Sequence, residues 1–415
     1  YRMNLKELAS EIKTIKIPDK GWENIHFVIP PPPPRELKEG LPYSLIGEAL
    51  RVLASLPAPG EMDDLDRLVS YLFVRREVVQ SSRLEGTWST LDHALTPGEL
   101  VDVNEGKDEH QAVRAYANLI EEVVQEGIEK RESVFTVELI SRIQQQIVER
   151  DPNSSGVPGK IRTFGEPGSI VTIGGGIRRE NSIYNPAPPQ EVLRCLKETL
   201  NWFSDTELAQ LGDAGAGLSL PVRLALGHAH FEAVHPFTDG NGRTGRTLWP
   251  LQMVCAGFMP LYLSGYVEAH RQDYTNALQQ AQKKLKYAPL VEFVCNAIIE
   301  SDLEAKATKN AIKELIEVWQ SRGGFREKSS AKRALKILVN YPIVTAQLLQ
   351  DKLGISSTAS LDAVNALVDK KILRFRHREN RKKVFAAEEI IQILARPFGS
   401  EIDLALEKAA SLLKL

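Results

Sequence analysis

The sequence predicts a mainly α-helical protein, because apolar side chains recur at three- and four-residue spacing along most of its length. In residues 61–85, for example, Leu65, Val69, Leu72 and Val79 follow this spacing with charged residues between them. Two short segments and the C-terminal part of the chain depart from the pattern. Helical patterns of the same kind cover residues 109–125, 136–150, 189–202, 222–234, 243–256, 271–285 and 290–317.

The length of 415 residues predicts two to four domains at roughly 100–200 residues each. Lys and Arg number 52 and Asp and Glu 54, so the net charge of −2 excludes a protein that binds polyanions over its whole surface. No run of about 18 apolar residues occurs, and the first residues lack the apolar centre of a signal peptide. We therefore expect a cytoplasmic protein without a membrane span. Cys195, Cys255 and Cys295 share no metal-type spacing, and we expect buried thiols.

The two short departures lie in the N-terminal half. Five prolines, Pro30 to Pro34, favour an extended conformation, which we interpret as a strap that packs on the helices; an SH3-type ligand is the alternative. Residues 156–189 are rich in Gly and Pro. There the β-capable runs 170–173 and 182–184 flank three glycines, which predicts a β-hairpin. Two strands alone bury little, so the hairpin is either a packed decoration or a working flap.

The C-terminal part begins after a break at residues 321–324. Helical patterns at 331–339, 345–353 and 357–370 precede two β-capable runs, 372–375 and 384–385. Three helices followed by a two-stranded hairpin is the order of a winged helix-turn-helix domain. We therefore predict such a domain at the C-terminal end.

The turn between these last two runs concentrates positive charge on a nearly neutral protein. Residues 371–383 hold seven cationic side chains against one anion, Glu379. The third helix begins with small polar residues around Ser356 that are able to meet phosphates or base edges. Three interpretations stay open: contact with DNA, contact with a protein partner or a second copy in a homodimer, and a solvated turn. The cations are Lys371, Arg374, Arg376, Arg378, Arg381, Lys382 and Lys383.

One segment, residues 235–246, has the parts of a nucleotide-phosphate site. Gly240 and Gly242 flank Asn241 just before a predicted helix, so successive backbone N–H groups are able to face an anion at the positive end of the helix. Arg243 and Arg246 are three residues apart on that helix and can grip phosphate oxygens together. No Gly-Lys-Ser or Gly-Lys-Thr follows the glycines, so this is not a Walker A loop.

Two more residues of the segment carry chemistry. Asp239 is its one carboxylate, and a lone carboxylate beside a polyphosphate suits Mg²⁺. His235 follows the preceding helix, and an imidazole there suits removal of a proton from an attacking hydroxyl. A glycine-rich turn with a capping aspartate and surface arginines is the alternative for any one residue alone.

The segment resembles the signature of the Fic family, His-x-Phe-x-Asp/Glu-Gly-Asn-Gly-Arg-x-x-Arg, with every fixed position present. The resemblance implies an enzyme that transfers AMP from ATP to a protein hydroxyl and releases pyrophosphate. It assigns the role of general base to His235, Mg²⁺ binding to Asp239, and the anion cradle to Gly240, Asn241 and Gly242. It also implies that Arg243 and Arg246 orient the β- and γ-phosphates and that Phe237 is a buried anchor.

A second match lies upstream. Ser81, Glu85 and Gly86 fit the inhibitory motif of Fic proteins, Ser/Thr-x-x-x-Glu-Gly/Asn. The resemblance implies that Glu85 pairs with Arg246 and takes the place of the γ-phosphate, so that ATP binds unproductively. Alternatively, Glu85 positions a water molecule and reverses the modification.

Two further matches concern the substrates. The predicted hairpin lies where Fic proteins carry a flap that clamps the target protein, and an exposed strand edge pairs with an extended peptide through main-chain hydrogen bonds. Related proteins also have a tyrosine-bearing helix near the adenine. Tyr274 is the candidate here and Tyr266 the second, although Thr275 replaces the second of the two adjacent tyrosines that many members have.

Taken with the resemblance, the sequence predicts a Fic-type helical bundle with a β-hairpin flap and a winged helix-turn-helix domain. We place an N-terminal region at 1–107, the Fic core at 108–320 and the winged helix at 325–415. The implied function is a protein adenylyltransferase that modifies a target and itself, with ATP as substrate and Mg²⁺ as cofactor. The rivals are an enzyme that uses another nucleotide or removes AMP, and a DNA-binding regulator whose core only senses a nucleotide.

Overall fold

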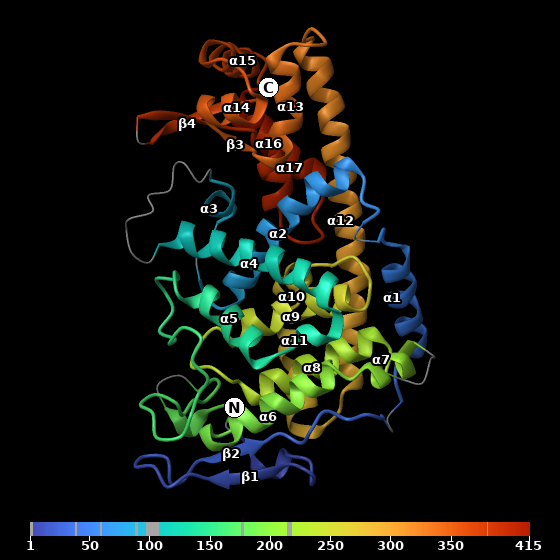
Figure 1. Ribbon diagram of the computed structural model, residues 1–415, viewed down its shortest axis with the longest axis vertical. Coiled ribbons are helices and arrows are strands. Elements are labelled where there is room, and N and C mark those ends of the chain that lie inside the picture. The colour runs from blue at the N-terminus through green and yellow to red at the C-terminus, as the bar shows by residue number, and fades with distance from the viewer. Residues whose placement is uncertain are drawn as a thin grey trace. The chain divides into compact units, whose positions relative to one another are not determined.

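A computed structural model describes residues 3–37, 40–58, 60–87, 90–96, 108–175, 178–213, 218–379 and 381–415. It is mainly helical, as the sequence predicts (Figure 1). The chain forms two compact units. The first unit comprises Tyr1–Gly60 and Asn118–Ile299, and the second comprises Glu61–Ala117 and Glu300–Leu415. The boundaries predicted from the sequence, near 107 and 320, differ from this grouping because residues 61–117 fold with the C-terminal part.

The first unit is built around α8 (Leu220–Val234) and α9 (Asn241–Cys255), two neighbouring helices with nearly every side chain buried. Because α8 is buried on all sides, it has to be enclosed by other helices. Gly227 permits this on one side, since a Cβ there would lie 2.2 Å from the Phe203 ring. The surrounding helices are α1 (Tyr43–Ser55), α5 (Val137–Val148), α6 (Pro189–Phe203), α7 (Thr206–Asp213), α10 (Ser264–Ala269) and α11 (Arg271–Lys284).

Two long helices span the boundaries between the units in sequence. They are α4 (Glu109–Lys130) and α12 (Ala288–Gly323). Short 3₁₀ turns complete the first unit at Leu5–Glu7, Arg131–Val134 and Arg179–Asn181.

The N-terminal segment packs on the first unit as a strap, which confirms the interpretation of the proline run. Strands β1 (Lys13–Lys16) and β2 (His26–Ile29) form an antiparallel pair before the prolines. The Trp202 indole N–H donates to the Pro34 carbonyl at 3.1 Å. The Val28 N–H donates to the Asn185 carbonyl at 3.0 Å.

The predicted β-hairpin at 170–184 is reduced to one antiparallel bridge, between Ile173 and Tyr184, and Gly176 lies outside the described residues. Ile183 and Tyr184 bond to Ile173, whereas the residues on either side of them bond to the N-terminal strap. The Ser182 carbonyl accepts the Met3 N–H at 2.6 Å, and the Asn185 carbonyl accepts from β2. A backbone group that already bonds to the N-terminal strap is not available to pair with a facing strand.

In the second unit, the C-terminal elements follow the order helix, strand, helix, helix, strand, strand. The strands form a three-stranded antiparallel sheet in the order β3-β5-β4, in which β3 was not predicted. These elements are α13 (Ser330–Asn340), β3 (Ile343–Val344), α14 (Ala346–Leu353), α15 (Ser357–Asp369), β4 (Arg374–Glu379) and β5 (Lys382–Ala386), followed by α16 (Glu388–Ala395) and α17 (Ile402–Leu413).

The helix that carries Ser81 belongs to this second unit. Val69 and Leu72 of α2 (Asp64–Leu84) share one apolar core with the C-terminal elements, and Leu91 of α3 (Leu91–Leu95) joins it. A buried ionic cluster adds to this packing. The Glu304 carboxylate lies 2.6 Å from the Arg76 guanidinium and 2.7 Å from that of Arg396.

Candidate active site

The signature segment forms a helix–loop–helix turn in which α8 ends, residues 235–240 form the loop and α9 begins. His235 is the C-cap of α8 and has left-handed backbone angles, with φ 51° and ψ 64°. This conformation is uncommon for a residue other than glycine. The loop therefore needs support from its surroundings, and a buried arginine supplies it.

Arg162 stabilises the loop through its buried guanidinium group. It is 2% exposed, and its guanidinium donates to the carbonyls of His235 at 2.8 Å and Val234 at 3.0 Å. It also donates to the Ser169 and Ala187 carbonyls, which belong to the predicted flap region and the segment after it. Burial lowers the pKa of Arg162 to about 9. One side chain thus ties the flap region to the backbone of the candidate base.

The Asn241 side chain closes the loop with two hydrogen bonds to the backbone of Phe237. Its side-chain amide donates to the Phe237 carbonyl at 2.9 Å, and its side-chain oxygen accepts the Phe237 N–H at 2.9 Å. Phe237 is fully buried, as predicted. Because the Asn241 side chain is used in these two hydrogen bonds, only the Asn241 backbone is left for the predicted anion cradle.

Gly240 is required by both conformation and space. Its φ is 82°, and a Cβ would lie 2.8 Å from Val148 Cγ1. It is the N-cap of α9, whose first turn contains Asn241, Gly242 and Arg243. The first N–H groups of a helix have no partner within the helix, and they favour an anion.

Asp239 lies in the loop with its carboxylate held by three donors. Oδ2 accepts the Ser154 hydroxyl at 2.7 Å and the Ser155 N–H at 3.1 Å, and Oδ1 accepts the Gly240 N–H at 2.6 Å. Among the described residues, no group of three or more His, Cys, Asp or Glu side chains could hold a metal ion. A single carboxylate nevertheless suits Mg²⁺, which takes few protein ligands and completes its shell with water and phosphate.

The two arginines of the signature lie on α9 and are both buried. The Arg243 guanidinium lies 2.5 Å from the Asp151 carboxylate, with side chains 4% and 1% exposed. Arg246 is 3% exposed and acts electrostatically on both Glu232 and His228 of α8. One predicted phosphate ligand is therefore already paired with a carboxylate that the sequence interpretation did not include.

The candidate base has a buried acidic neighbour. Glu232 Oε2 lies 3.7 Å from His235 Nδ1, and the Glu232 side chain is 9% exposed. Burial tends to raise the pKa of Glu232, but His235, His228 and Arg246 hold that pKa below its usual value. An ionised carboxylate beside Nδ1 favours a proton on Nδ1 and leaves Nε2 free to accept another.

Tyr274, the candidate for the adenine, lies beside α8. Its hydroxyl is 2.7 Å from His228 Nε2, and its ring lies 5.6 Å from that of Phe293. His228 is buried, and its ring centroid lies 4.3 Å from that of Trp249. The adenine assignment remains a prediction, because Tyr274 serves the packing of α8 in any case.

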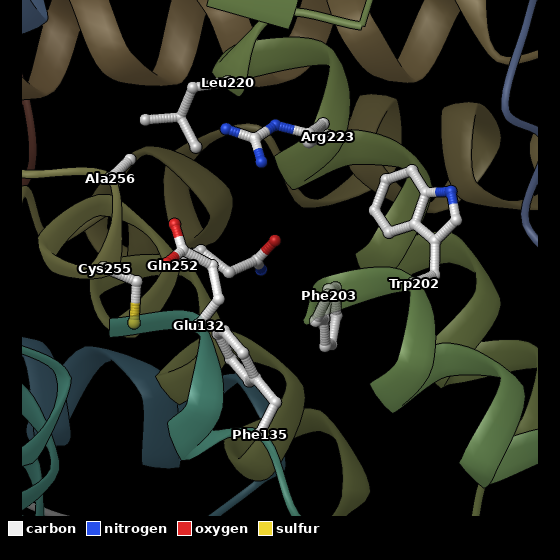
Figure 2. Close-up of a pocket in the computed structure, with 9 residues that line it drawn as sticks. All are labelled: Glu132, Phe135, Trp202, Phe203, Leu220, Arg223, Gln252, Cys255 and Ala256. Carbon is white, nitrogen blue, oxygen red and sulfur yellow. The ribbon is translucent and has the colours of Figure 1, made fainter. Parts of the chain in front are cut away.

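A small cavity lies at the opposite ends of α8 and α9 from the loop (Figure 2). Figure 2 shows Glu132 and Gln252 near its centre, with the Trp202 ring to one side. Its volume is about 20 Å³, which is room for about one water molecule. It is therefore not the nucleotide site.

The predicted inhibitory residues lie at the end of α2, in the second unit. The Ser81 hydroxyl is buried 3.2 Å from the Tyr116 hydroxyl. Glu85 is the C-cap of α2, and Gly86 follows with φ 82°, the left-handed turn that commonly ends a helix. The pairing of Glu85 with Arg246 remains a prediction.

Residues 134–253 match the family model described as Fic/DOC family. It is 35% identical over 94 residues to a protein adenylyltransferase, fic-1 of Caenorhabditis elegans, which is 22% of this chain and 16% of that protein. It is 23% identical over 229 residues to a probable protein adenylyltransferase, aq_aa38 of Aquifex aeolicus, which is 54% of this chain and 62% of that protein. The chain therefore spans less than two thirds of these curated relatives.

A solved structure extends the likeness at the level of the fold. A Fic family protein from Desulfovibrio desulfuricans G20 matches with a TM-score of 0.51 and 18% identity, over 86% of this chain and 98% of that one. No helix among the described residues is both long and apolar enough to cross a membrane.

The sequence did not indicate that four residues support the signature segment: Gln144, Asp151, Ser154 and Arg162. Each acts on the signature segment from a distance of more than 70 residues along the chain. No periodicity or spacing marks such contacts. Only the folded arrangement of α5, the loop after it and α9 brings them together.

Proposed function

We propose that the chain is a protein adenylyltransferase that transfers AMP from ATP to a hydroxyl group of a protein. The observation that carries this proposal is the geometry of the signature loop, which places His235 and the first turn of α9 on one short turn within a Fic domain. The curated relatives named as adenylyltransferases support the same reaction.

The reaction divides among the residues of the loop. A protein hydroxyl attacks the α-phosphorus of ATP, a new P–O bond forms, and the bond to the leaving pyrophosphate breaks. His235 Nε2 accepts the hydroxyl proton, with Glu232 facing Nδ1 on the other side of the ring. The amides of the first turn of α9 and Arg246 stabilise the negative charge that develops on the phosphates.

Asp239 would hold Mg²⁺ in this proposal. The ion supplies charge neutralisation at the phosphate oxygens. The donor set fits, because Mg²⁺ at triphosphates is bound through one or two carboxylates.

Labelling by α-³²P-ATP tests the proposal. We expect the Glu85→Gly protein to label itself or lysate proteins, and the Glu85→Gly/His235→Ala protein to lose at least about 100-fold of that labelling, the low end of the contribution of a general base. Parallel reactions with GTP, CTP and UTP identify the donor. Absence of label from every nucleotide contradicts the transferase and favours a core that only senses nucleotides.

We further propose that Glu85 inhibits the transfer and that the C-terminal elements set its position. The support is that α2 shares its core and a buried ionic cluster with those elements. A partner that binds the C-terminal elements thus acts on the segment that bears Glu85. Removal of AMP through a water held by Glu85 is the alternative, and release of AMP from purified modified protein distinguishes it.

We propose that the C-terminal elements are a winged helix that binds a protein in the cytoplasm. Two of the seven cations predicted for the wing are already paired, because Arg374 and Arg376 both contact the buried Glu388 carboxylate. The helix in the recognition position, α15, carries Asp362 and Asp369 and no cation, which suits DNA poorly. Salt-sensitive binding of duplex DNA would contradict this proposal.

The target protein, we propose, docks beside the segment that follows Arg162. Phe164 is 59% exposed there. An open pocket of about 240 Å³ lies next to it, and its lining includes Ile17, Ile170 and Pro189. Main-chain pairing with residues 170–172 would present an extended target segment to His235.

A further inference from the structure

We propose that Ser154 is a positioning residue for the magnesium-binding carboxylate, an inference that rests on the proposed function. The residues concerned form a loop after α5, residues 151–156, which we call the clamp loop. It contacts the signature segment at two places, Asp239 and Arg243. Both are residues to which the sequence assigns the triphosphate and its metal ion.

Three donors limit the orientation of the Asp239 carboxylate. A carboxylate has about four lone-pair directions. The Ser154 hydroxyl, the Ser155 N–H and the Gly240 N–H use three of them. The carboxylate therefore cannot rotate freely, and it is left with about one direction for a metal ion.

The Ser154 hydroxyl has a defined direction. Its oxygen accepts the Gly156 N–H at 3.2 Å and its hydroxyl group donates to Asp239 Oδ2 at 2.7 Å. Gly156 lies so close that a Cβ there would be 2.9 Å from the Cβ of Asp239. The clamp loop and the signature loop therefore pack closely at this point.

The clamp loop has other contacts that fix its place. At its start, the Asp151 carboxylate is buried against Arg243. Three residues after its end, the Gly159 N–H donates to the side-chain oxygen of the fully buried Gln144 at 2.6 Å, and the Gln144 side-chain amide donates to the Asp239 carbonyl at 3.0 Å. Because these contacts persist without the Ser154 hydroxyl, its removal frees the carboxylate without releasing the loop.

Adjacent serines provide a matched test. Ser154→Ala removes a donor to Asp239, whereas Ser155→Ala keeps its backbone N–H and removes only an exposed hydroxyl. Both are made in the full chain with Glu85→Gly and His235→Ala, which leaves ATP intact. The measurement is the Mg²⁺ concentration at half-maximal ATP binding.

We expect Ser154→Ala to raise this Mg²⁺ concentration about tenfold, the usual effect of losing a partner behind a metal ligand, and Ser155→Ala to leave it unchanged. Equal values for the two variants overturn the inference. If even the parent protein binds no ATP at any Mg²⁺ concentration, the proposed function fails. Crystal structures of the two variants then decide the inference: a turned Asp239 carboxylate in Ser154→Ala alone supports it, and the same orientation in both overturns it.

Discussion

The buried charges around the signature loop are the residues whose replacement tells most about the mechanism. Glu232 faces Nδ1 of His235 from one helical turn away. We expect Glu232→Gln to lower the rate of labelling at saturating ATP by about tenfold or more, because a carboxylate partner that sets the imidazole tautomer is worth up to about 10⁴-fold. Initial rates in the Glu85→Gly protein measure this effect.

The control for Glu232 is Glu198→Gln, which removes a carboxylate that pairs with Arg194 on α6. This variant should label at the rate of its parent. A change in the Michaelis constant for ATP alone in Glu232→Gln would show that Glu232 serves nucleotide binding and not the base.

The Asp151–Arg243 pair allows a prediction about stability. Breaking a buried ion pair leaves an unpaired charge and costs about 3–5 kcal/mol, whereas an exposed pair is worth less than about 1 kcal/mol. We therefore expect Asp151→Asn to lower the free energy of unfolding far more than Glu191→Gln, whose carboxylate pairs with Arg194 at the surface. Urea unfolding compares the two, and equal losses would contradict the burial of the pair.

Two buried histidines of α8 predict a loss of stability in acid. Burial lowers the pKa of His228 to about 4 and that of His230 to about 3, from an ordinary value of 6.5. The unfolded chain takes up protons as the pH falls below about 6.5, while the folded protein keeps both rings neutral until the lower values. The free energy of unfolding should therefore fall between about pH 6.5 and pH 4.

Urea midpoints across this range check the acid prediction, with His230→Gln as the variant. Removing one of the two rings should flatten the decline with pH. An unchanged slope in His230→Gln would mean that His230 binds its proton equally well in both states.

The candidate site residues could be picked out from the sequence where they lie at neighbouring positions. His235, Asp239, Gly240 and Arg246 lie within one short segment, so a sequence pattern finds them together. The partners of these residues come from other parts of the chain and become visible only in the folded structure. For the same reason, the sequence assigned Arg243 to phosphate without revealing its carboxylate partner, Asp151.

At the level of elements, the segment after Arg162 carries a prediction about target recognition. Phe164 is exposed beside an open pocket. We expect Phe164→Ala to lower labelling of lysate proteins several-fold in the Glu85→Gly background, because a large buried aromatic contact dominates many interfaces. Leu193→Ala, which removes an exposed apolar side chain of α6, is the control. Equal labelling in both variants would place the docking surface elsewhere.

Helix α3 and strand β4 carry a prediction about regulation. The Asp92 carboxylate of α3 lies 2.8 Å from Arg376 of β4, and α3 follows the segment that contains Glu85. We expect Asp92→Asn to raise self-labelling about two- to fivefold, in line with a partly exposed pair worth up to about 1 kcal/mol. Asp362→Asn on α15 is the control. If self-labelling does not increase in Asp92→Asn, the C-terminal elements do not control inhibition through this pair.

The helices were more predictable than the strands. Long helical segments such as α8 show several turns of apolar spacing, whereas β3 has two residues and β1 four. The expected strands at 170–173 and 182–184 pair only around Ile173 and Tyr184, and the Ser182 carbonyl at the start of the second run bonds to the N-terminal strap instead. Strand pairing depends on partners that local sequence does not specify.

For the whole molecule, the grouping into two units was the least predictable feature. The apolar residues of a helix such as α2 predict the helix but not which part of the chain covers them. Here the cover consists of C-terminal residues such as Leu335 and Leu338, more than 250 positions away. The N-terminal region predicted at 1–107 is therefore divided between both units.

The central claim is that the protein transfers the nucleotide part of ATP. The most direct measurement compares labelling of the Glu85→Gly protein by ATP carrying ³²P at the α-phosphate with labelling by ATP carrying it at the γ-phosphate. We predict that protein-bound label appears from the α-position alone and disappears with His235→Ala. Label from the γ-position, or α-label that persists without His235, would contradict the account.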